Sequence, residues 1–191
     1  GPKNFCVKTI VTTELIRAIC EKYGVKIYNV LTGFKFIADV VRRNEADGGE
    51  FVCGGEESYG FNVGQFVRDK DAPISCAMVA ECAAWAADQG KTLYQLLQDI
   101  YAEFGYYKEG LVSLVREGKA GAEEIAAIMV DMRNNPPKEL AGAAVVKVVD
   151  YLKPDETGLP SSNVLQFYSA EGDVVSVRPS GTEPKIKFYF G

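Results

Sequence analysis

The spacing of apolar residues changes part-way along this 191-residue chain, and that change limits the possible folds more than any other feature. Up to about residue 105, segments with helical spacing alternate with short strand-like runs, whereas the rest is mostly strand-like. Alternation of this kind is typical of a layered β/α domain with a parallel or mixed sheet, and strands joined by turns favour an antiparallel sheet. We therefore expect an α/β protein with a β/α layered domain over 1–105 and a smaller α+β domain over 106–191.

The first part of the chain has four segments with helical spacing and two with strand character. Helices are expected from Thr12 or Thr13 to Gly24, over 34–43, from Pro73 or Ser75 to about Gly90, and after Thr92. Thr92 and Gln95 have the spacing of a capping box. Strands are expected over 25–31 and 50–53. The residues expected to face inward from the second helix are Phe34, Ile37, Val40 and Val41.

The second part contains one predicted helix followed only by strands. The helix covers 122–133 and ends at Asn134-Asn135-Pro136-Pro137, because proline cannot continue a helix. Glu171-Gly172-Asp173 predicts a hairpin turn. The expected strands are 143–152, 164–169, 174–177 and 186–190. The domain boundary is expected between Gly105 and Gly121.

Charge and composition exclude several classes of function. The net charge is −5, so the chain has no basic footprint for nucleic acid and no polybasic patch for a membrane surface. No apolar run approaches the length of a membrane span, and no signal-like segment opens the chain. We expect no nucleic-acid or membrane partner and a cytoplasmic location.

The absence of histidine restricts the available chemistry. A Ser-His-Asp or Cys-His nucleophile, a histidine-bound zinc and imidazole acid–base catalysis are all excluded. The five cysteines are odd in number and contain no C-x-x-C pair, so we expect buried structural thiols in a reducing compartment. They are Cys6, Cys20, Cys53, Cys76 and Cys82.

The strongest functional signal is the segment from Arg178 to Lys185, Arg-Pro-Ser-Gly-Thr-Glu-Pro-Lys, between two predicted strands. It gathers a guanidinium, two hydroxyls, a lysine and backbone amides around Gly181, which are the groups that hold a phosphate dianion. Composition and spacing alone leave an ordinary hairpin turn equally open.

Three further segments carry weaker signals. Gly54-Gly55-Glu56-Glu57-Ser58-Tyr59-Gly60 suits recognition of sugar hydroxyls, or is a solvated acidic turn, and a magnesium site there has little support. In Thr32-Gly33-Phe34-Lys35 the lysine either reaches a ligand or lies on the surface. Arg68-Asp69-Lys70-Asp71 is a solvated loop or an ion-pair cluster.

Taken together along the chain, the four segments resemble the α-D-phosphohexomutase family of phosphoglucomutases and phosphomannomutases. The resemblance covers nearly the whole chain and corresponds to the third and fourth of four domains. It implies transfer of phosphate between the 1- and 6-positions of a hexose phosphate, through a phosphoserine and glucose 1,6-bisphosphate or a similar intermediate. The phosphoserine loop and the loop that binds Mg²⁺ belong to the first two domains, and neither motif occurs here. The resemblance therefore implies a fragment that is inactive alone, with the missing N-terminal domains as its partners.

The resemblance also assigns roles to residues. Sugar contacts are implied for Glu56, Ser58, Thr32 and Lys35. Phosphate contacts are implied for Arg178, Ser180, Gly181, Thr182 and Lys185. Lys70 matches a lysine of the family, with Ala72 in place of a following glycine, and Tyr59 matches the subgroup with an aromatic residue after the serine. The resemblance further leads us to expect exposed apolar surface where the missing domains would pack.

Alternatives remain at this point. Specificity could be that of a phosphopentomutase or a phosphoglucosamine mutase. The chain could also be a free-standing module that binds sugar phosphates.

Overall fold

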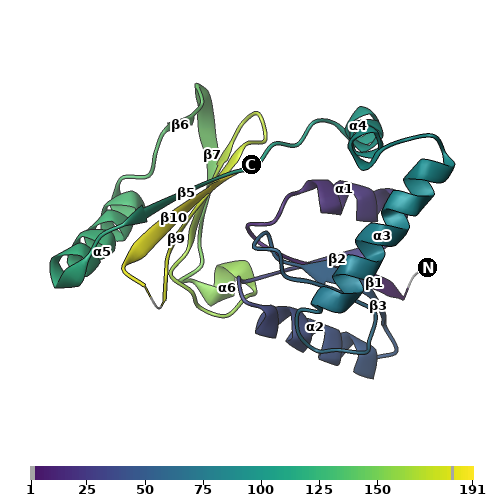
Figure 1. Ribbon diagram of the computed structural model, residues 1–191. Coiled ribbons are helices and arrows are strands. Elements are labelled where there is room, and N and C mark those ends of the chain that lie inside the picture. Colours follow the sequence, from purple (N-terminus) through teal and green to yellow (C-terminus); the bar gives the residue numbers. More distant parts are fainter. Residues whose placement is uncertain (1–2, 182) are drawn as a thin grey trace. The chain divides into compact units, whose positions relative to one another are not determined.

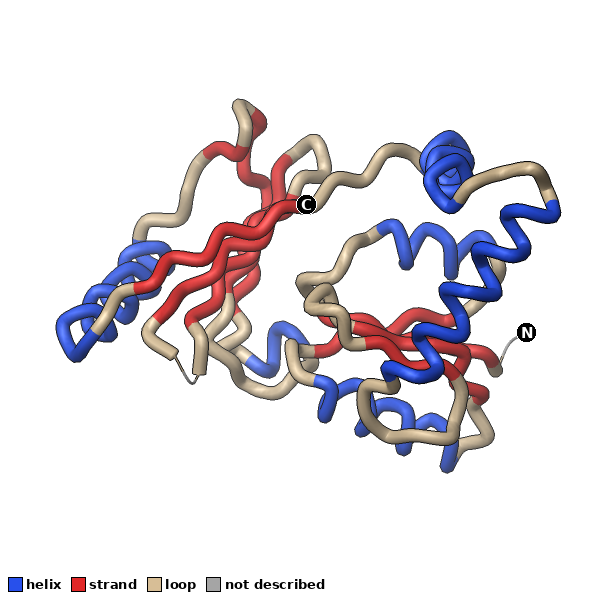
Figure 2. The backbone as a smooth tube through the Cα atoms, in the orientation of Figure 1, coloured by secondary structure: helices blue, strands red, loops and turns tan. Residues whose placement is uncertain are grey.

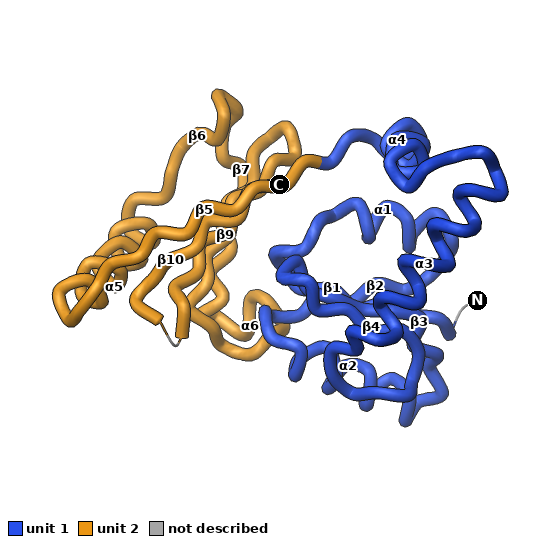
Figure 3. Tube along the Cα trace, viewed as in Figure 1, with its two compact units in different colours: residues 1–107 blue, residues 108–191 orange. Residues whose placement is uncertain are grey.

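The computed structural model describes residues 3–181 and 183–191, so Thr182 of the candidate phosphate loop lies outside the described residues. The chain divides into two compact units, Gly1–Tyr107 and Lys108–Gly191 (Figure 3). In the described part of the chain, every helix is too short or too polar to cross a bilayer. The expected combination of a mixed sheet in the first unit and an antiparallel sheet in the second is confirmed.

The first unit is built on a four-stranded sheet (Figure 1). Its strands are β1 (Asn4–Thr9), β2 (Lys26–Val30), β3 (Glu50–Gly55) and β4 (Phe61–Val63), in the order β2-β1-β3-β4. The strands β2 and β3 both run parallel to β1, and β4 runs antiparallel to β3. The strand β1 therefore lies in the middle of the three parallel strands, and the sequence patterns above do not predict it.

Helices lie on both sides of this sheet. They are α1 (Leu15–Lys22), α2 (Phe34–Ala46), α3 (Ala72–Asp88) and α4 (Leu93–Phe104). Figure 2 shows α1 and α2 on opposite sides of the strands. The four residues of α2 that were expected to face inward are buried, and they pack with Phe5, Val7 and Phe51 of the sheet. Each such side chain contributes about 1.5–3 kcal/mol when fully buried, so α2 and this face form the core of the unit.

The starts of two helices differ from the prediction, and a third agrees with it. Neither Thr12 nor Thr13 is the N-cap of α1; that position is Glu14, whose side chain makes no capping bond. Helix α3 starts earlier than expected, because the Asp71 side chain accepts a hydrogen bond from the backbone N–H of Ile74. The capping box of Thr92 and Gln95 is present at the start of α4.

The second unit is a six-stranded sheet with one long helix on it. The sheet has the order β5-β10-β9-β8-β7-β6 with antiparallel neighbours. The core joins residues of the helix α5 to Leu165, Phe167, Val177 and Ile186 of the strands. The elements are β5 (Gly110–Val115), α5 (Gly118–Asn134), β6 (Glu139–Leu140), β7 (Ala143–Asp150), α6 (Pro154–Thr157), β8 (Leu165–Ser169), β9 (Val174–Pro179) and β10 (Lys185–Phe190).

The second part differs from expectation in two ways. The units divide between Tyr107 and Lys108, within the range 105–121, but the sequence patterns above do not predict β5, which pairs along its length with β10 and belongs to the sheet. The chain after the long helix is not made of strands alone, since the short helix α6 follows β7. The hairpin turn expected at 171–173 does join β8 to β9.

The expectation of buried thiols holds for only part of the set. Cys6 and Cys20 are buried and Cys53 is half-buried, whereas Cys76 and Cys82 are exposed. Both exposed cysteines lie on α3, a helix rich in apolar residues of which only Ala86 is buried. Val79 and Trp85 of the same helix are 59% and 55% exposed. The first unit therefore presents an apolar helix to its surroundings.

Candidate functional site

The carboxyl ends of three parallel strands meet at one edge of the first unit's sheet. Residues 32–35 follow β2 and residues 56–60 follow β3, while Thr9 ends β1 between them. The chain leaves β1 through α1 on one side of the sheet and reaches β3 through α2 on the other. In open α/β sheets, ligands bind outside the carboxyl ends of strands where the connections change sides in this way.

Glu56 connects two of the candidate segments. Its Oε1 accepts a hydrogen bond of 2.6 Å from the backbone N–H of Gly33, directly before α2. A carboxylate bound to an N–H at a helix start makes a charge-assisted bond and interacts favourably with the helix dipole. The half-buried Glu56 is thus held in place beside Thr32, and the sugar-loop candidates and the Thr32–Lys35 segment form one site.

Lys70 belongs to the same place. A methyl group added to Gly60 would lie 3.0 Å from Lys70 Cδ and 3.2 Å from Glu56 Oε2, so both side chains pass close over this glycine. Lys70 Nζ also lies 5.2 Å from the centre of the Phe34 ring and 2.7 Å from Asp69 Oδ1. The Arg68–Asp71 segment therefore contributes a lysine to the edge formed by the other two segments.

The tip of the loop after β3 is exposed. Ser58 faces solvent, and Tyr59 is fully exposed with φ of 65°, a left-handed conformation that is uncommon for a non-glycine residue. Such conformations cost free energy and cluster at ligand-binding sites. The loop presents its hydroxyl groups outward, beyond the anchored Glu56.

Sequence reasoning missed Lys8, which the fold buries completely on β1. Its Nζ donates to Glu14 Oε1 and to the carbonyl oxygen of Thr12, both at 2.8 Å. The neighbouring Thr9 hydroxyl lies 3.3 Å from Glu57 Oε2, which connects this cluster to the loop after β3. No local pattern marks Lys8, because a lysine at the end of a strand is normally exposed.

Burial and pairing shift the pKa values of this cluster. Burial lowers the pKa of Lys8, although the bond to Glu14 opposes the shift. Burial acts to raise the pKa of Glu14, but the bonds from Lys8 and Arg17 outweigh it and hold that pKa below its usual value. The carboxylate of the half-exposed Glu14 therefore stabilises the protonated form of the buried Lys8.

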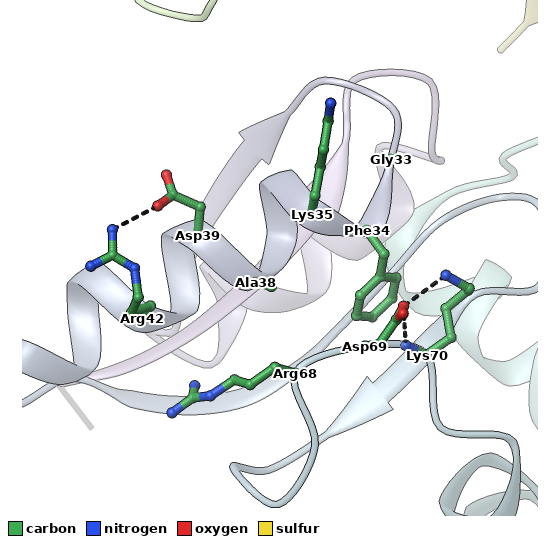
Figure 4. Close-up of a pocket in the computed structure, with 9 residues that line it drawn as sticks. All are labelled: Gly33, Phe34, Lys35, Ala38, Asp39, Arg42, Arg68, Asp69 and Lys70. Carbon is green, nitrogen blue, oxygen red and sulfur yellow. Dashed lines mark hydrogen bonds and ion pairs between the residues drawn. The ribbon is translucent and has the colours of Figure 1, made fainter.

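A cavity of about 670 Å³ lies beside this site (Figure 4). It is lined by residues 33–35, 38, 39 and 42 at the start of α2 and by residues 68–70. Arg42 pairs with Asp39 and Lys70 with Asp69, whereas Lys35 forms no ion pair within the described ranges. Lys35 is thus an exposed cation available to an anionic ligand at the helix start.

In the second unit, the candidate phosphate loop joins β9 to β10. Arg178 of β9 lies directly opposite Lys187 of β10, and each alternates with a residue of the buried core. Like charges at directly opposite positions repel one another. Neither cation forms a direct ion pair in the part of the chain that is described, although Lys187 acts on the more distant Glu183 carboxylate and helps to lower its pKa. The face of the sheet away from α5 therefore carries two neighbouring cations next to the loop.

The loop itself is tightly closed at its base. The backbone N–H of Ser180 donates to the carbonyl of Lys185 at 2.8 Å, and the Ser180 hydroxyl accepts from the N–H of Glu183. Lys185 pairs with Glu183, and that bond lowers the pKa of the exposed Glu183 carboxyl. A methyl group on Gly181 would meet nothing within 4 Å among the described residues, so no contact with them requires glycine there.

No cluster of three or more histidine, cysteine, aspartate or glutamate side chains that could hold a metal ion is found among the described residues. The arrangement can thus bind an anion and accept hydrogen bonds from hydroxyl groups. The first unit defines an α/β domain with its ligand loops at one sheet edge, and the second a smaller domain with a cationic hairpin.

Comparisons with known proteins identify the family. A model described as the alpha/beta/alpha domain III of phosphoglucomutase/phosphomannomutase matches residues 1–104, and one described as the C-terminal domain matches residues 111–191. The chain belongs to the phosphoglucomutase/phosphomannomutase family. It is 38% identical to phosphoglucomutases of Staphylococcus haemolyticus and Staphylococcus aureus over 193 residues, which is 96% of this chain and 35% of theirs. The chain therefore spans about a third of the length of these relatives.

Solved structures support the fold. Parafusin, a phosphoglucomutase from Paramecium in its open form, matches with a TM-score of 0.71 and 20% identity over 97% of this chain and 32% of its own. A protein described as a phosphomannomutase from Thermus thermophilus matches with a TM-score of 0.63 and 19% identity, over 99% of this chain and 33% of its own. At these identities the likeness concerns the fold.

Proposed function

We propose that this chain is the sugar- and phosphate-binding part of a phosphohexomutase that interconverts hexose 1-phosphate and hexose 6-phosphate. The observation that carries the proposal is the meeting of three separate family segments at one sheet edge, tied together by the bond from Gly33 to Glu56. A turn made only of solvated residues has no need of a carboxylate anchored to a helix start beside a lysine. Membership of the family supports the reaction class.

The two units would divide the substrate between them. Arg178, Ser180, Gly181, Thr182 and Lys185 would hold the phosphate that is not transferred, and Arg178 is suited to bidentate contact with it. Glu56 and Ser58 would bind the sugar hydroxyls, with Thr32 and Lys35 beside them. Phosphoryl transfer depends mainly on positioning and charge stabilisation, which these groups can supply.

The remaining chemistry would come from outside this chain. A phosphoserine would donate the phosphoryl group, glucose 1,6-bisphosphate would be the intermediate, and Mg²⁺ would stabilise charge on the transferred phosphate. The intermediate must bind in two orientations before it returns its other phosphate. Exposed hydroxyl contacts such as that of Ser58 suit this requirement better than a rigid set of bonds would.

The missing N-terminal domains would be the partners of this chain. The exposed apolar residues of α3, including Val79 and Trp85, offer a surface for such packing. The fragment alone would then bind substrate weakly and catalyse no transfer.

The test is titration calorimetry with glucose 1,6-bisphosphate, comparing the unmutated chain with Arg178→Ala and Lys119→Ala. Lys119 is a matched control because it is a 92% exposed cation on α5, which packs on the other face of the sheet. Saturable binding that only Arg178→Ala removes would support the proposal. Equal binding by all three proteins would contradict it. If the unmutated chain gives no heat at millimolar ligand, the same two variants are compared in a longer protein that includes the N-terminal domains.

A further inference from the structure

Two cysteines face each other across neighbouring strands of the first unit. Cys6 of β1 and Cys53 of β3 are paired in register, and their Sγ atoms are 3.7 Å apart. The site proposed above for sugar and phosphate uses neither thiol.

A bulge in β3 produces this pairing. Phe5 pairs with Phe51, but the next residue of β1, Cys6, pairs with Cys53, so that Val52 is an extra residue in β3. In a regular register Val52 would pair with Cys6, and Cys53 would lie on the same face of the sheet as Phe51, because side chains alternate between the faces of a strand. The irregular register therefore brings two thiols together on the face opposite to the Phe5 core.

A third thiol lies on the same side of the sheet. Cys20 of α1 is buried and interacts with Cys6. Hydrogen bonding from the Cys53 thiol lowers the pKa of Cys6 to about 6, with burial acting in the opposite direction. Burial raises the pKa of Cys20 to about 12, and the interaction with Cys6 raises the pKa of Cys53. Cys6 is therefore the thiol of this group that loses its proton most readily, and the thiolate is the nucleophilic form.

We propose that Cys6 and Cys53 form a reversible oxidation site, in which a peroxide converts the two thiols into a disulfide between β1 and β3. The Cys6 thiolate attacks one oxygen of hydrogen peroxide, the O–O bond breaks, and Cys6 becomes a sulfenic acid as hydroxide leaves. The Cys53 thiol then attacks the Cys6 sulfur and forms the S–S bond. The sulfenic hydroxyl leaves as water with the Cys53 proton. Two electrons pass from the sulfur pair to the peroxide, and the overall products are the disulfide and two water molecules.

The disulfide fits the strand geometry. Neighbouring strands are about 4.8 Å apart, which lies within the range of about 4.4–6.8 Å between the Cα atoms of a disulfide, so the bond can form in the observed register. A dithiol reductant returns the pair to thiols by thiol–disulfide exchange.

Cys53 is the partner rather than Cys20 because it is already in register with Cys6 at 3.7 Å. Cys53 is also half-buried, whereas Cys20 is buried within the layer of α1. Cys76 and Cys82 are exposed and separated by six positions on one helix, so their side chains point to different sides of α3. They are not part of the site.

The experiment uses the chain with Cys76→Ser and Cys82→Ser, so that Cys6, Cys20 and Cys53 remain. It is treated with hydrogen peroxide, quenched with catalase, and alkylated under denaturing conditions. We expect the loss of the mass of two hydrogen atoms and one alkylated thiol per chain. Trypsin places the three cysteines in separate peptides, 4–8, 18–22 and 44–68, and the expected product joins the first to the third. Dithiothreitol must restore three alkylated thiols.

Two variants complete the test. Cys20→Ser must still form the link between peptides 4–8 and 44–68, and Cys53→Ser must lose it. A link between peptides 4–8 and 18–22, addition of oxygen without a disulfide, or three unchanged thiols after peroxide would each overturn the proposal. Because the three-cysteine chain by itself distinguishes these outcomes, a variant that fails to fold does not obscure the result.

Discussion

Replacing Glu14 with glutamine should cost more stability than replacing the lysine that it neutralises. Lys8 is 1% exposed in its side chain and Glu14 is 43% exposed. Glu14→Gln keeps an oxygen that can accept a hydrogen bond but removes the negative charge, so the buried ammonium keeps only neutral acceptors. Lys8→Met removes the buried charge itself and fills the space with a similar apolar stem.

The size of the effect follows from the burial of the two partners. Removing one partner of a fully buried ion pair costs roughly 3–5 kcal/mol. Water reaches Glu14 and screens the pair, which reduces the cost to about 2 kcal/mol. Arg17 is the control, because it bonds to Glu14 at 2.7 Å but is itself 37% exposed. Arg17→Gln should cost about 0.5 kcal/mol, as an exposed pair does.

The assay is urea unfolding followed by tryptophan fluorescence. Trp85 is the chain's single tryptophan and lies in the first unit, so the signal reports the unit that contains Lys8. The free energy of unfolding comes from the midpoint and slope of the transition. Lys8→Met should lower the free energy of unfolding by less than Glu14→Gln does.

The dependence on pH gives a second, independent readout. The folded pKa of Lys8 lies below 10.5, and removing Glu14 lowers it further. Between that folded pKa and 10.5, the unfolded chain binds more protons than the folded one. The stability of the Glu14→Gln protein should therefore recover as the pH rises towards 10.5. The reasoning fails if Glu14→Gln costs no more than Arg17→Gln, or if its cost is the same at every pH in this window.

Three further predictions concern the other structural features. Gly181→Ala should leave the unfolding midpoint unchanged, because no described residue lies within 4 Å of the added methyl group. It should weaken the binding of glucose 1,6-bisphosphate in calorimetry, and unchanged binding would argue against close approach of a ligand to this backbone. Glu56→Gln should cost the first unit about 1 kcal/mol in urea unfolding through loss of its charge-assisted bond to Gly33, and a stability equal to wild type would contradict this. Phe167→Ala should destabilise the second unit by about 3–5 kcal/mol, since its side chain is fully buried, and circular dichroism should show that unit melting earlier than the first.

The sequence predicts this fold best where local periodicity and burial agree. The inward face of α2 follows directly from apolar spacing, because most of the other positions of this helix carry charges. The capping box of α4 needs only the local pair Thr92 and Gln95. In contrast, β1 carries cysteine and lysine on one face, so it lacks a clear pattern of apolar residues. Its place between β2 and β3 depends on pairing with these two strands, which follow it in the sequence.

For the candidate site, too, local features can be predicted from the sequence and contacts between distant segments cannot. The residue types in each loop can be recognised from the sequence, since Arg178 and Glu56 lie in distinctive segments. The bond between Glu56 and Gly33 could not be predicted, because it exists only once β2 and β3 lie on either side of β1. Lys8 was missed for the related reason that burial of a charge is a property of the assembled layers. Composition cannot distinguish an anchored carboxylate from a solvated one.

The position of β10 sets the order in which the second unit can assemble. This strand lies between β5 and β9, although it is the last of these strands to be synthesised. During translation β5 emerges early and its partner edge stays unpaired until β10 has left the ribosome. Contacts between residues so far apart in sequence form slowly, and an unpaired strand edge invites association with other chains. The strands of the first unit are all synthesised before β5, whereas β5 gains its partner only when β10, the last strand of the second unit, has been made.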